Sequence, residues 1–550
     1  MKNKSFIDKS FMDDIGFKNI RSWLTARVSC KENINYFTQL TPTSNPENLI
    51  DSFSFTDELL KSLIRKENLL SPKLSDLSAV ILSLEKIKSI LEISEFVEIK
   101  TMIEYYFDMK KRFKDKQFNL WRKKISPIDN PENILNKINT IIDSKSNIRK
   151  TASKKLNEII LSINKVESRL ETKIKSELEK YVKLGFLRDD KIVFRAGKVM
   201  LAVNSSNKNK IKGVVDGFSA TRQTCFIQPI SLVELTNRLS ELEANKSREI
   251  TKILKKLTLD ISPFYNQLND MYDLIKFYDK HLTKALIAYK INAIKPKFSN
   301  KLILKDAINP IFTLANKKYI PLDVTLGPND KTIVISGPNS GGKTIVIKSI
   351  GLYSVMAQCG LFVPAKKVEL PIFKTFLSDI GDKQSIQDDL STFSAHMKSM
   401  STIIEKSNQN SLIIIDEMGT GTDPDIGSSL SISILKKLTQ NKSLNFCTTH
   451  LNPLKIWANE NQNSKNACME FDNDKIEPTY IFKLGSPGSS YGIEIAERMG
   501  VNKNIIKDAS KNLNEKSFRM EKLLKETNDN HKKSLMQLED AKKKNSKIII

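Results

Sequence analysis

An eight-residue segment near the middle of the chain has the composition of a phosphate-binding loop. It matches the pattern G-x-x-x-x-G-K-T and comprises Gly337, Pro338, Asn339, Ser340, Gly341, Gly342, Lys343 and Thr344. An apolar run at 332–335 precedes it and a helical run at 345–353 follows it, as the pattern requires. Glycines let backbone N–H groups surround phosphates, and a helix N-terminus favours anions. We therefore expect ATP as a ligand, with Lys343 on its β- and γ-phosphates and Thr344 on Mg²⁺.

Two adjacent carboxylates follow an apolar run at 411–415. This run indicates a strand buried on both faces, so that Asp416 and Glu417 lie at its carboxyl end. Asp416 is suited to hold Mg²⁺, usually through water, and Glu417 is suited to polarise the attacking water as a general base. An apolar strand that ends in two acids is common by itself, so this prediction depends on the phosphate-binding loop.

A histidine follows another apolar run, at 445–449. At the end of a strand, His450 would sense the γ-phosphate and the attacking water. A structural role is the more frequent one for a single histidine, and it stays an alternative. The chain has only 4 histidines, however, and this one lies where a sensor is expected.

The pattern from about 300 to 500 alternates strands and helices, which is typical of an α/β nucleotide-binding domain. Carboxyl ends of parallel strands meet at one edge of the sheet, where ligands bind in open α/β folds. Lys343, Asp416 and His450 are therefore expected to converge there. Together these residues predict an ATPase.

Two long amphipathic helices are predicted on the N-terminal side of this domain. Apolar residues recur at spacings of three and four over 159–181 and again over 232–257. The sequence Ser-Leu-Val-Glu at 231–234 has the spacing of a capping box, so the second helix is expected to open there.

Between these helices, at about 185–230, short β-type runs are separated by Gly and Asn/Ser turns. Two long helices that flank a small β insert form an arm with a tip. Basic residues lie beside the polar turns of the tip and are candidates for contact with a nucleic-acid backbone: Lys208, Lys210, Lys212 and Arg222. An ordinary solvated loop explains the same residues equally well.

The charge balance is strongly basic, with 88 Lys and Arg against 63 Asp and Glu and a formal net charge of +25. Such an excess suits a polyanionic partner, because each contact with a phosphate releases condensed counterions. A bias toward Lys, Asn and Ile that AT-rich coding produces is the alternative explanation. Charge alone does not decide between them.

The 5 cysteines are scattered and include no C-x-x-C pair. This argues against a zinc site or a disulfide framework and fits a reducing compartment. Charges occur throughout the first twenty residues, and no apolar run approaches the roughly 18 residues needed to span a bilayer. We therefore expect a cytoplasmic protein without a membrane partner.

The motifs of the chain resemble those of the MutS family, and in detail those of its second bacterial subfamily. The resemblance extends from about 150 to 510 and is weak over the first 150 residues. Besides the phosphate-binding loop it rests on blocks at 212–229, 379–393, 416–424, 448–450 and 478–496.

This resemblance implies a homodimer whose two ATPase domains pack face to face. Ser391 and Thr392 would form the signature segment that approaches the nucleotide of the opposite subunit. The segment 419–423 would be a cross-subunit loop, and 485–500 would be a helix-turn-helix dimerisation element. The two arms with their β tip would act as a clamp.

The expected fold is multi-domain, with a helical core and lever, long coiled arms, a small β clamp tip and an α/β P-loop ATPase domain of the ABC type. The expected domains are a helical core at 1–150, a lever and clamp at 151–295, the ATPase domain at 296–511 and a charged coiled tail at 512–550.

Three departures from the family pattern limit what the resemblance implies. The Gly-x-Phe-Tyr-Glu wedge of the mismatch-reading branch does not occur in 1–150. The block before the phosphate-binding strand is Ala-Ile-Asn-Pro at 307–310 instead of an aromatic or Arg-His-Pro block, which leaves adenine stacking open. The chain ends at Ile550 without the small MutS-related (Smr) nuclease domain of the subfamily, so nuclease activity is not expected. Truncation of a longer protein is an alternative.

The function expected from these features is an ATP-dependent clamp on double-stranded, branched or otherwise unusual DNA. It would limit homologous recombination and would show no mismatch specificity. One alternative is a ribosome-associated ATPase that acts on stalled or collided ribosomes. Another is a structural remnant of the family that turns over no ATP.

Overall fold

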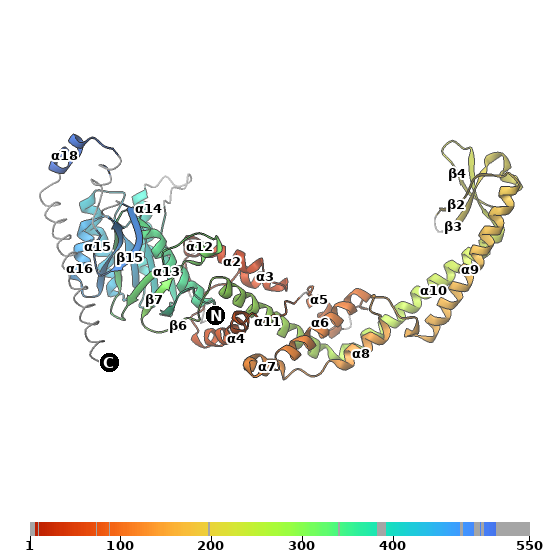
Figure 1. Ribbon diagram of the computed structural model, residues 1–550, viewed down its shortest axis with the longest axis horizontal. Helices are drawn as coiled ribbons and strands as arrows, with labels where there is room; N and C mark the ends of the chain where they lie inside the picture. The colour runs from red at the N-terminus through yellow and green to blue at the C-terminus, as the bar shows by residue number, and fades with distance from the viewer. Residues whose placement is uncertain are drawn as a thin grey trace. The chain divides into compact units, whose positions relative to one another are not determined.

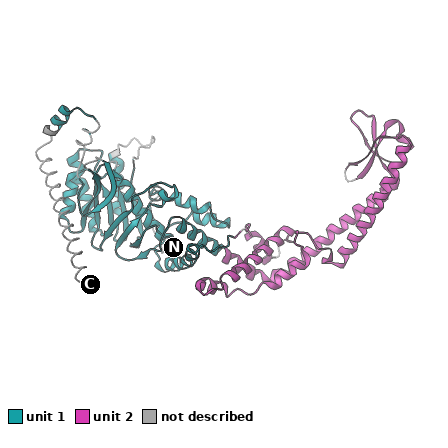
Figure 2. Ribbon diagram, viewed as in Figure 1, with its two compact units in different colours: residues 1–71, 276–550 teal, residues 72–275 magenta. Residues whose placement is uncertain are grey.

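The computed structural model describes residues 6–8, 10–72, 74–86, 89–195, 198–338, 341–381, 392–472, 477–488, 496 and 500–512. The chain divides into two compact units, residues 1–71 with 276–550 and residues 72–275 (Figure 2). The predicted multi-domain architecture of mixed helix and sheet is thereby confirmed. No helix among the described residues is both long enough and apolar enough to cross a membrane.

The first unit, residues 1–71 with 276–550, is built on a seven-stranded sheet in the order β1-β11-β12-β13-β9-β14-β15. Neighbouring strands are parallel except for the β14–β15 pair. The strands are β1 (Phe6–Ile7), β9 (Thr332–Ser336), β11 (Thr375–Asp379), β12 (Ser411–Ile415), β13 (Leu444–Thr448), β14 (Ser464–Asp472) and β15 (Glu477–Leu484). Every residue of β9, β11, β12 and β13 is buried, as expected for parallel strands covered on both faces.

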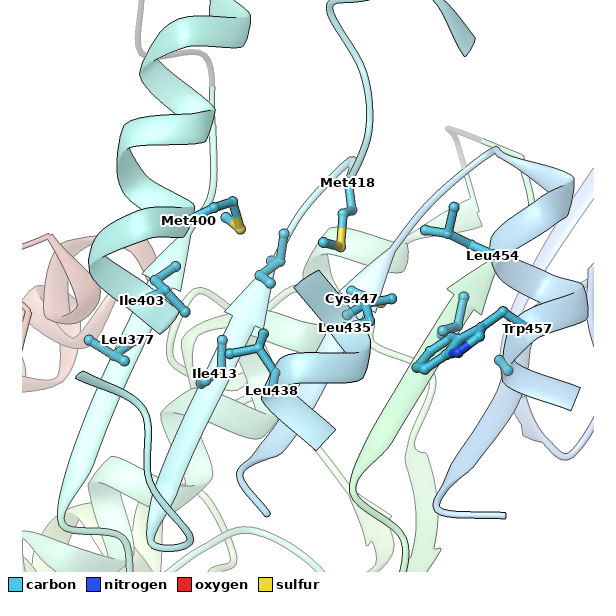
Figure 3. Close-up of a cluster of buried hydrophobic side chains, with 13 residues drawn as sticks. Leu377, Met400, Ile403, Ile413, Met418, Leu435, Leu438, Cys447, Leu454 and Trp457 are labelled. Atoms are coloured by element: carbon cyan, nitrogen blue, oxygen red, sulfur yellow. The ribbon is translucent and has the colours of Figure 1, made fainter. Parts of the chain in front are cut away.

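Helices cover both faces of this sheet because side chains of a strand alternate between the faces. Ile413 and Ile415 of β12 pack in a core cluster with apolar side chains from three helices on one face (Figure 3). Ile414 points the other way, toward Gly351 of the fourth helix. The three helices are α14 (Thr392–Lys406), α15 (Pro424–Gln440) and α16 (Asn452–Glu460), and the fourth is α13 (Lys343–Gln358).

A four-stranded sheet in the order β6-β10-β7-β8 completes the β structure of this unit. Its strands are β6 (Lys297–Phe298), β7 (Leu302–Ala307), β8 (Leu322–Leu326) and β10 (Lys367–Leu370). Further helices of the unit are α1 (Phe11–Asp14), α2 (Phe17–Thr25), α3 (Glu32–Thr38), α4 (Pro46–Ile64), α12 (Pro310–Leu314) and α18 (Lys503–Asn512).

The first described residues of the chain belong to the edge of the large sheet. Strand β1 pairs in parallel with β11, and Phe11 packs against Phe376 with ring centroids 5.3 Å apart. Ser378 Oγ donates a hydrogen bond to Asp14 Oδ2 at 2.6 Å. The sequence gives no sign of this pairing, because two residues of strand carry no periodicity.

The second unit, residues 72–275, consists of helices and one antiparallel sheet. The helices are α5 (Ser78–Lys86), α6 (Ile93–Arg112), α7 (Asn119–Ile125), α8 (Glu132–Ile141), α9 (Lys154–Lys183) and α10 (Ile230–Ile261). The boundary between the units falls within α11 (Tyr265–Lys290). The long helices α9 and α10 run side by side (Figure 1).

The sheet between α9 and α10 has the order β2-β3-β5-β4. Its strands are β2 (Leu187–Arg195), β3 (Lys198–Asn204), β4 (Gly213–Phe218) and β5 (Thr224–Pro229). Leu170 of α9, Val199 of β3 and Leu232 of α10 form one core cluster, which joins the sheet to both helices. Strand β4 was not among the β-type runs read from the sequence.

The capping box predicted at Ser231 is wrong. Helix α10 begins at Ile230 after Pro229, and no side chain caps it. Ser231 lies inside the helix, where its Oγ donates to Glu177 Oε1 of α9 at 2.7 Å. The hydroxyl of Ser231 therefore bonds to the neighbouring helix α9, and the spacing of residues within α10 does not reveal this contact.

Candidate nucleotide site

The predicted phosphate-binding loop connects the buried strand β9 to the first residue of α13. Two of its glycines have left-handed backbone, with φ +132° at Gly337 and φ +89° at Gly342. Gly342 is the N-cap of α13, and a Cβ atom at Gly341 would lie 3.1 Å from Met469 Cβ. Turn geometry and close packing thus both require glycine here. Asn339 and Ser340 lie outside the described residues.

Lys343 is the central side chain of this loop. It is only 4% exposed, and its Nζ donates to the carbonyl oxygens of Gly337 at 2.7 Å and Pro338 at 3.1 Å. Burial lowers the pKa of Lys343 to about 8, although Asp416 and Glu417 act in the opposite direction. The ammonium is thus held inside the loop by carbonyls that phosphate oxygens would replace.

His450 follows β13 by two residues and contacts this lysine. Lys343 Nζ lies 3.1 Å from His450 Nε2, so Nε2 accepts the hydrogen bond and the ring proton is on Nδ1. Burial, with the positive charges of Lys343 and Lys455, lowers the pKa of His450. The imidazole is therefore neutral at pH 7 and in direct contact with Lys343.

Oxygen atoms gather next to the loop, at the ends of β12 and β13. Thr344 Oγ1 donates to Asp416 Oδ2 at 2.7 Å, and Thr448 Oγ1 donates to the other oxygen of the same carboxylate. A hydroxyl and a carboxylate are ligands that suit Mg²⁺, which usually takes one or two protein oxygens together with phosphate and water. The residues present therefore fit this ion, although no group of three His, Cys, Asp or Glu side chains that could hold a metal occurs among the described residues.

Glu417 has an unusual backbone that directs its exposed side chain. Its φ is +51°, a left-handed conformation that a residue with a Cβ seldom adopts. The neighbours hold it there: Glu417 N donates to Thr448 Oγ1 at 2.8 Å, and Met418 N donates to Thr448 O at 2.9 Å. Met418 is buried in the core cluster of the sheet (Figure 3). Such strain persists where the surrounding structure imposes it, which is typical of functional sites.

A cavity of about 520 Å³ opens beside Gly341 and Gly342. Aromatic and aliphatic side chains form most of its wall: Phe312, Tyr319, Ile320, Pro321, Leu322, Ile345, Val346, Met469 and Tyr480. Its size and apolar walls suit a nucleobase, and flat rings provide stacking surfaces. Sequence reasoning missed these residues because they come from separate segments of the chain.

A comparison with known proteins places this site within one family. The family model for MutS domain V matches residues 333–517. The chain is 32% identical to Endonuclease MutS2 of Thermotoga maritima over 510 residues, which cover 92% of this chain and 65% of that protein. The chain belongs to the MutS family. It is of the MutS2 type.

Two further relatives have the same name. Endonuclease MutS2 of Caldicellulosiruptor saccharolyticus is 32% identical over 514 residues, with 92% of this chain and 65% of that protein covered. The protein of Carboxydothermus hydrogenoformans is 36% identical over 390 residues, with 70% and 49% covered. This MutS-family chain thus spans less than two thirds of the length of these relatives.

A brace beneath the loop of this MutS-family chain was not predicted from its sequence. Gly488 N donates to Ser336 Oγ at 2.7 Å, and the buried Lys455 Nζ donates to Gly488 O at 2.9 Å. A Cβ atom at Gly488 would lie 3.0 Å from the backbone nitrogen of Gly337. Position 488 therefore needs glycine. The hydrogen bond from its backbone nitrogen to Ser336 connects the segment before 489 to the base of the loop.

A second unpredicted contact lies at the end of β11. His396 Nδ1 of α14 lies 2.6 Å from Asp379 Oδ2, and Asp416 N donates to Asp379 O at 2.9 Å. Helix α14 begins at Thr392, of which the side chain is not described, and Ser391 lies outside the described residues.

The four basic residues predicted at the arm tip lie in the second unit, where all are exposed. Lys208 Nζ lies 5.7 Å from the ring centroid of Phe218, and Lys210 Nζ lies 5.2 Å from that of Phe186. Lys212 directly precedes β4, whereas Arg222 lies in the turn between β4 and β5 and has a left-handed φ of +56°.

Proposed function

We propose that the chain binds ATP with Mg²⁺ and hydrolyses it at the site around Lys343. The observation that carries this proposal is the arrangement of five side chains beside a base-sized apolar cavity: Lys343, Thr344, Asp416, Glu417 and His450. The match to MutS domain V over 333–517 supports it. Phe312, Tyr319 and Tyr480 would stack on the adenine ring, despite the altered block at 307–310.

Each side chain has a separate role in this proposal. Lys343 would exchange its carbonyl partners for β- and γ-phosphate oxygens. Thr344 and Asp416 would hold Mg²⁺, which when bound neutralises charge on the phosphate oxygens. Glu417 would accept a proton from the attacking water as general base, and its exposure leaves it free to do so. His450 would sense whether Lys343 is engaged by phosphate.

The partner that we propose is double-stranded DNA, above all branched or otherwise unusual DNA. Eight basic residues against three aspartates lie between 187 and 229 in the sheet and its loops: Arg188, Lys191, Arg195, Lys198, Lys208, Lys210, Lys212 and Arg222. A surface of this charge is suited to the phosphate backbone. The helices α9 and α10 would form the arm of a clamp, within a lever and clamp domain at 151–295.

The remaining expectations from the family belong to the same proposal. A homodimer would form through the ATPase domain at 296–511, and Ser391 and Thr392 would complete the nucleotide site of the partner subunit. The helical core at 1–150 and the charged tail at 512–550 would complete the domain organisation of a cytoplasmic protein. Clamping would limit homologous recombination, without mismatch specificity because the wedge motif does not occur in 1–150.

The DNA half of the proposal is tested by measuring affinity for a perfect duplex, a single mismatch and a four-way junction at two salt concentrations. We expect the junction to bind best, the mismatch to gain less than about tenfold over the duplex, and affinity to fall steeply with salt. Substitution of Lys208, Lys210, Lys212 and Arg222 by alanine should weaken all three complexes and reduce the salt slope. The matched control, Lys436→Ala with Lys437→Ala on α15, should leave both unchanged.

A tenfold preference for the mismatch would contradict the proposed binding mode. So would co-sedimentation with ribosomes at concentrations where no junction is bound, since that result favours the ribosome-associated alternative. The DNA recovered after incubation with Mg²⁺ and ATP should be uncut on a denaturing gel, because the carboxylates of the site are used for nucleotide chemistry.

A further inference from the structure

A polar cavity of about 490 Å³ lies at the opposite end of α13 from Lys343. Its wall comes from α3, the segment that joins α3 to α4, the first two turns of α4, the helix α11 and the turn at 358–360. Amide, hydroxyl and ammonium groups contribute much of this wall, among them Gln39, Thr43, Asn48, Ser52 and Lys284. The cavity thus differs in character from the apolar one beside the phosphate-binding loop.

Lys284 is the charged group of this cavity. It is 3% exposed, and its Nζ donates to Ser52 Oγ at 3.2 Å and to Cys359 O at 3.4 Å. Both acceptors are neutral, the second distance is long, and an ammonium has three protons to donate. Among the described residues, no Asp or Glu lines the cavity. A buried ammonium with such partners is costly unless an anion compensates it.

Other groups around the cavity add to its positive character. Arg21 Nη2 donates to Leu40 O at 2.6 Å, and Lys280 Nζ lies 4.6 Å from the ring centroid of Tyr36. Leu40 and Tyr36 both line the cavity. Two further cations therefore stand against residues of its wall, and an anion that enters would be attracted by all three.

Gly360 keeps the space in front of Lys284 open. Its φ is +71°, and a Cβ atom there would lie 3.0 Å from both Lys284 Nζ and Ser52 Oγ. The contact of Lys284 with Cys359 O would by itself be explained as a cation at the C-terminus of α13. That explanation accounts for one hydrogen bond but for neither the cavity nor its polar wall.

We propose that this cavity binds a small polar molecule that carries an oxyanion, either a carboxylate or a phosphate ester, with Lys284 as the cationic contact. The hydroxyl and amide groups of Thr43, Asn48 and Gln39 would bind its remaining polar atoms. Its occupant would touch the turn that follows α13, where Gln358 Nε2 donates to Thr43 O at 3.1 Å and to Phe373 O at 2.8 Å. Binding in this cavity would therefore contact the C-terminal end of α13, the helix that starts at Lys343.

The test uses inorganic phosphate and sodium acetate as probes, with sodium chloride at equal ionic strength as the reference. Thermal unfolding of the full chain is followed while each probe is titrated. We expect a saturable rise in Tm with at least one probe, and the probe that acts distinguishes a phosphate site from a carboxylate site. Phosphate also stabilises proteins through exclusion from their surface, so the comparison between variants is decisive.

Lys284→Met should weaken the apparent affinity for the active probe at least about tenfold. Lys290→Met, an exposed lysine of the same helix, should behave like the wild type. Lys343→Ala should also keep the saturable rise, which separates this cavity from the phosphate-binding loop and from the proposed ATPase function. Asn48→Trp, at an exposed position of the wall, should block entry without a loss of buried packing.

The proposal is overturned if neither probe gives a saturable rise over chloride. It is equally overturned if the rise persists in both Lys284→Met and Asn48→Trp. If Lys284→Met fails to fold, Asn48→Trp decides alone, because its side chain starts from an exposed position.

Discussion

Single residues determine what the candidate nucleotide site can do, through contacts between side chains that are far apart in the sequence. Lys343 joins the phosphate-binding loop to His450, and Asp416 joins Thr344 to Thr448. The side chains predicted from the sequence lie in the phosphate-binding motif or directly follow an apolar strand. The contacts of Thr448, Lys455 and Gly488 were not predicted, because hydroxyls, lysines and glycines occur throughout any sequence and their contacts depend on the folded neighbours.

The first prediction concerns His281, a buried histidine outside the site. It is 5% exposed, its Nδ1 lies 2.9 Å from Thr56 Oγ1, and burial, with Lys284 and Lys280, lowers its pKa well below 6.5. Below pH 6.5 the unfolded chain therefore binds a proton that the folded chain does not. The contribution of neutral His281 to the free energy of unfolding is fully present above about pH 6.5 and is lost as the pH falls below that value.

The free energy of unfolding should accordingly fall by up to about 1.4 kcal/mol for each pH unit between pH 6.5 and 5 on account of this group. His281→Phe should lack that part of the slope, and the two proteins should show parallel profiles above pH 7. Urea unfolding followed by circular dichroism at several pH values measures the difference. Equal slopes for the two proteins below pH 6.5 would contradict the assignment.

Strands and helices position these residues, and the sequence predicted the strands correctly where their apolar runs were continuous. The runs at 332–335, 411–415 and 445–449 correspond to β9, β12 and β13, respectively. Buried parallel strands are apolar along their whole length, so they are visible in the sequence as continuous apolar runs. Strand β1 left no such signal, and its partner β11 lies far along the chain. The predicted start of α10 was wrong for another reason: the hydroxyl of Ser231 donates a hydrogen bond to Glu177 of the adjacent helix and does not cap α10.

A matched pair of substitutions tests the packing of α10 against the sheet. Leu232 is fully buried in the cluster with Leu170 and Val199, whereas Ile230, two residues earlier, is 66% exposed. Leu232→Ala should destabilise the second unit by about 2–5 kcal/mol, because it leaves a cavity in a small core. Ile230→Ala should cost well under 1 kcal/mol.

Limited proteolysis with identification of the cleavage sites measures this difference. Cleavage within 154–261 should accelerate strongly in Leu232→Ala and remain at the parental rate in Ile230→Ala. Equal susceptibility of the two variants would show that the cluster does not hold the sheet to the helix.

At the scale of the whole molecule, the proposed nucleotide site and the basic residues around β4 belong to different units of one MutS-family chain. The proposed function requires these parts to work together, and it also requires a second copy of the chain. The helix-turn-helix at 485–500 lies largely outside the described residues, as does nearly all of the tail at 512–550. Both stay predictions that rest on the family.

A mixing experiment tests the proposed dimer. Lys343→Ala lacks the lysine of its own site, and Thr392→Ala lacks a residue that its partner's site needs. Each variant alone should be nearly inactive, whereas an equal mixture should recover about a quarter of the wild-type activity per dimer, through the one intact site of mixed dimers. Full ATPase activity of a monomer in dilute solution would rule out shared sites.

The most direct test of the central claim is phosphate release from ATP by the wild type, Lys343→Ala and Glu417→Gln, measured together with ATP binding. The wild type should turn over ATP, and Lys343→Ala should lose binding and turnover together. Glu417→Gln should bind ATP like the wild type but hydrolyse it at least about a hundredfold more slowly, the scale of general-base loss. The control Glu405→Gln, at an exposed position of α14, should be unchanged. Turnover by Glu417→Gln at the parental rate would contradict the assigned base, and absence of turnover in the wild type would contradict the ATPase itself.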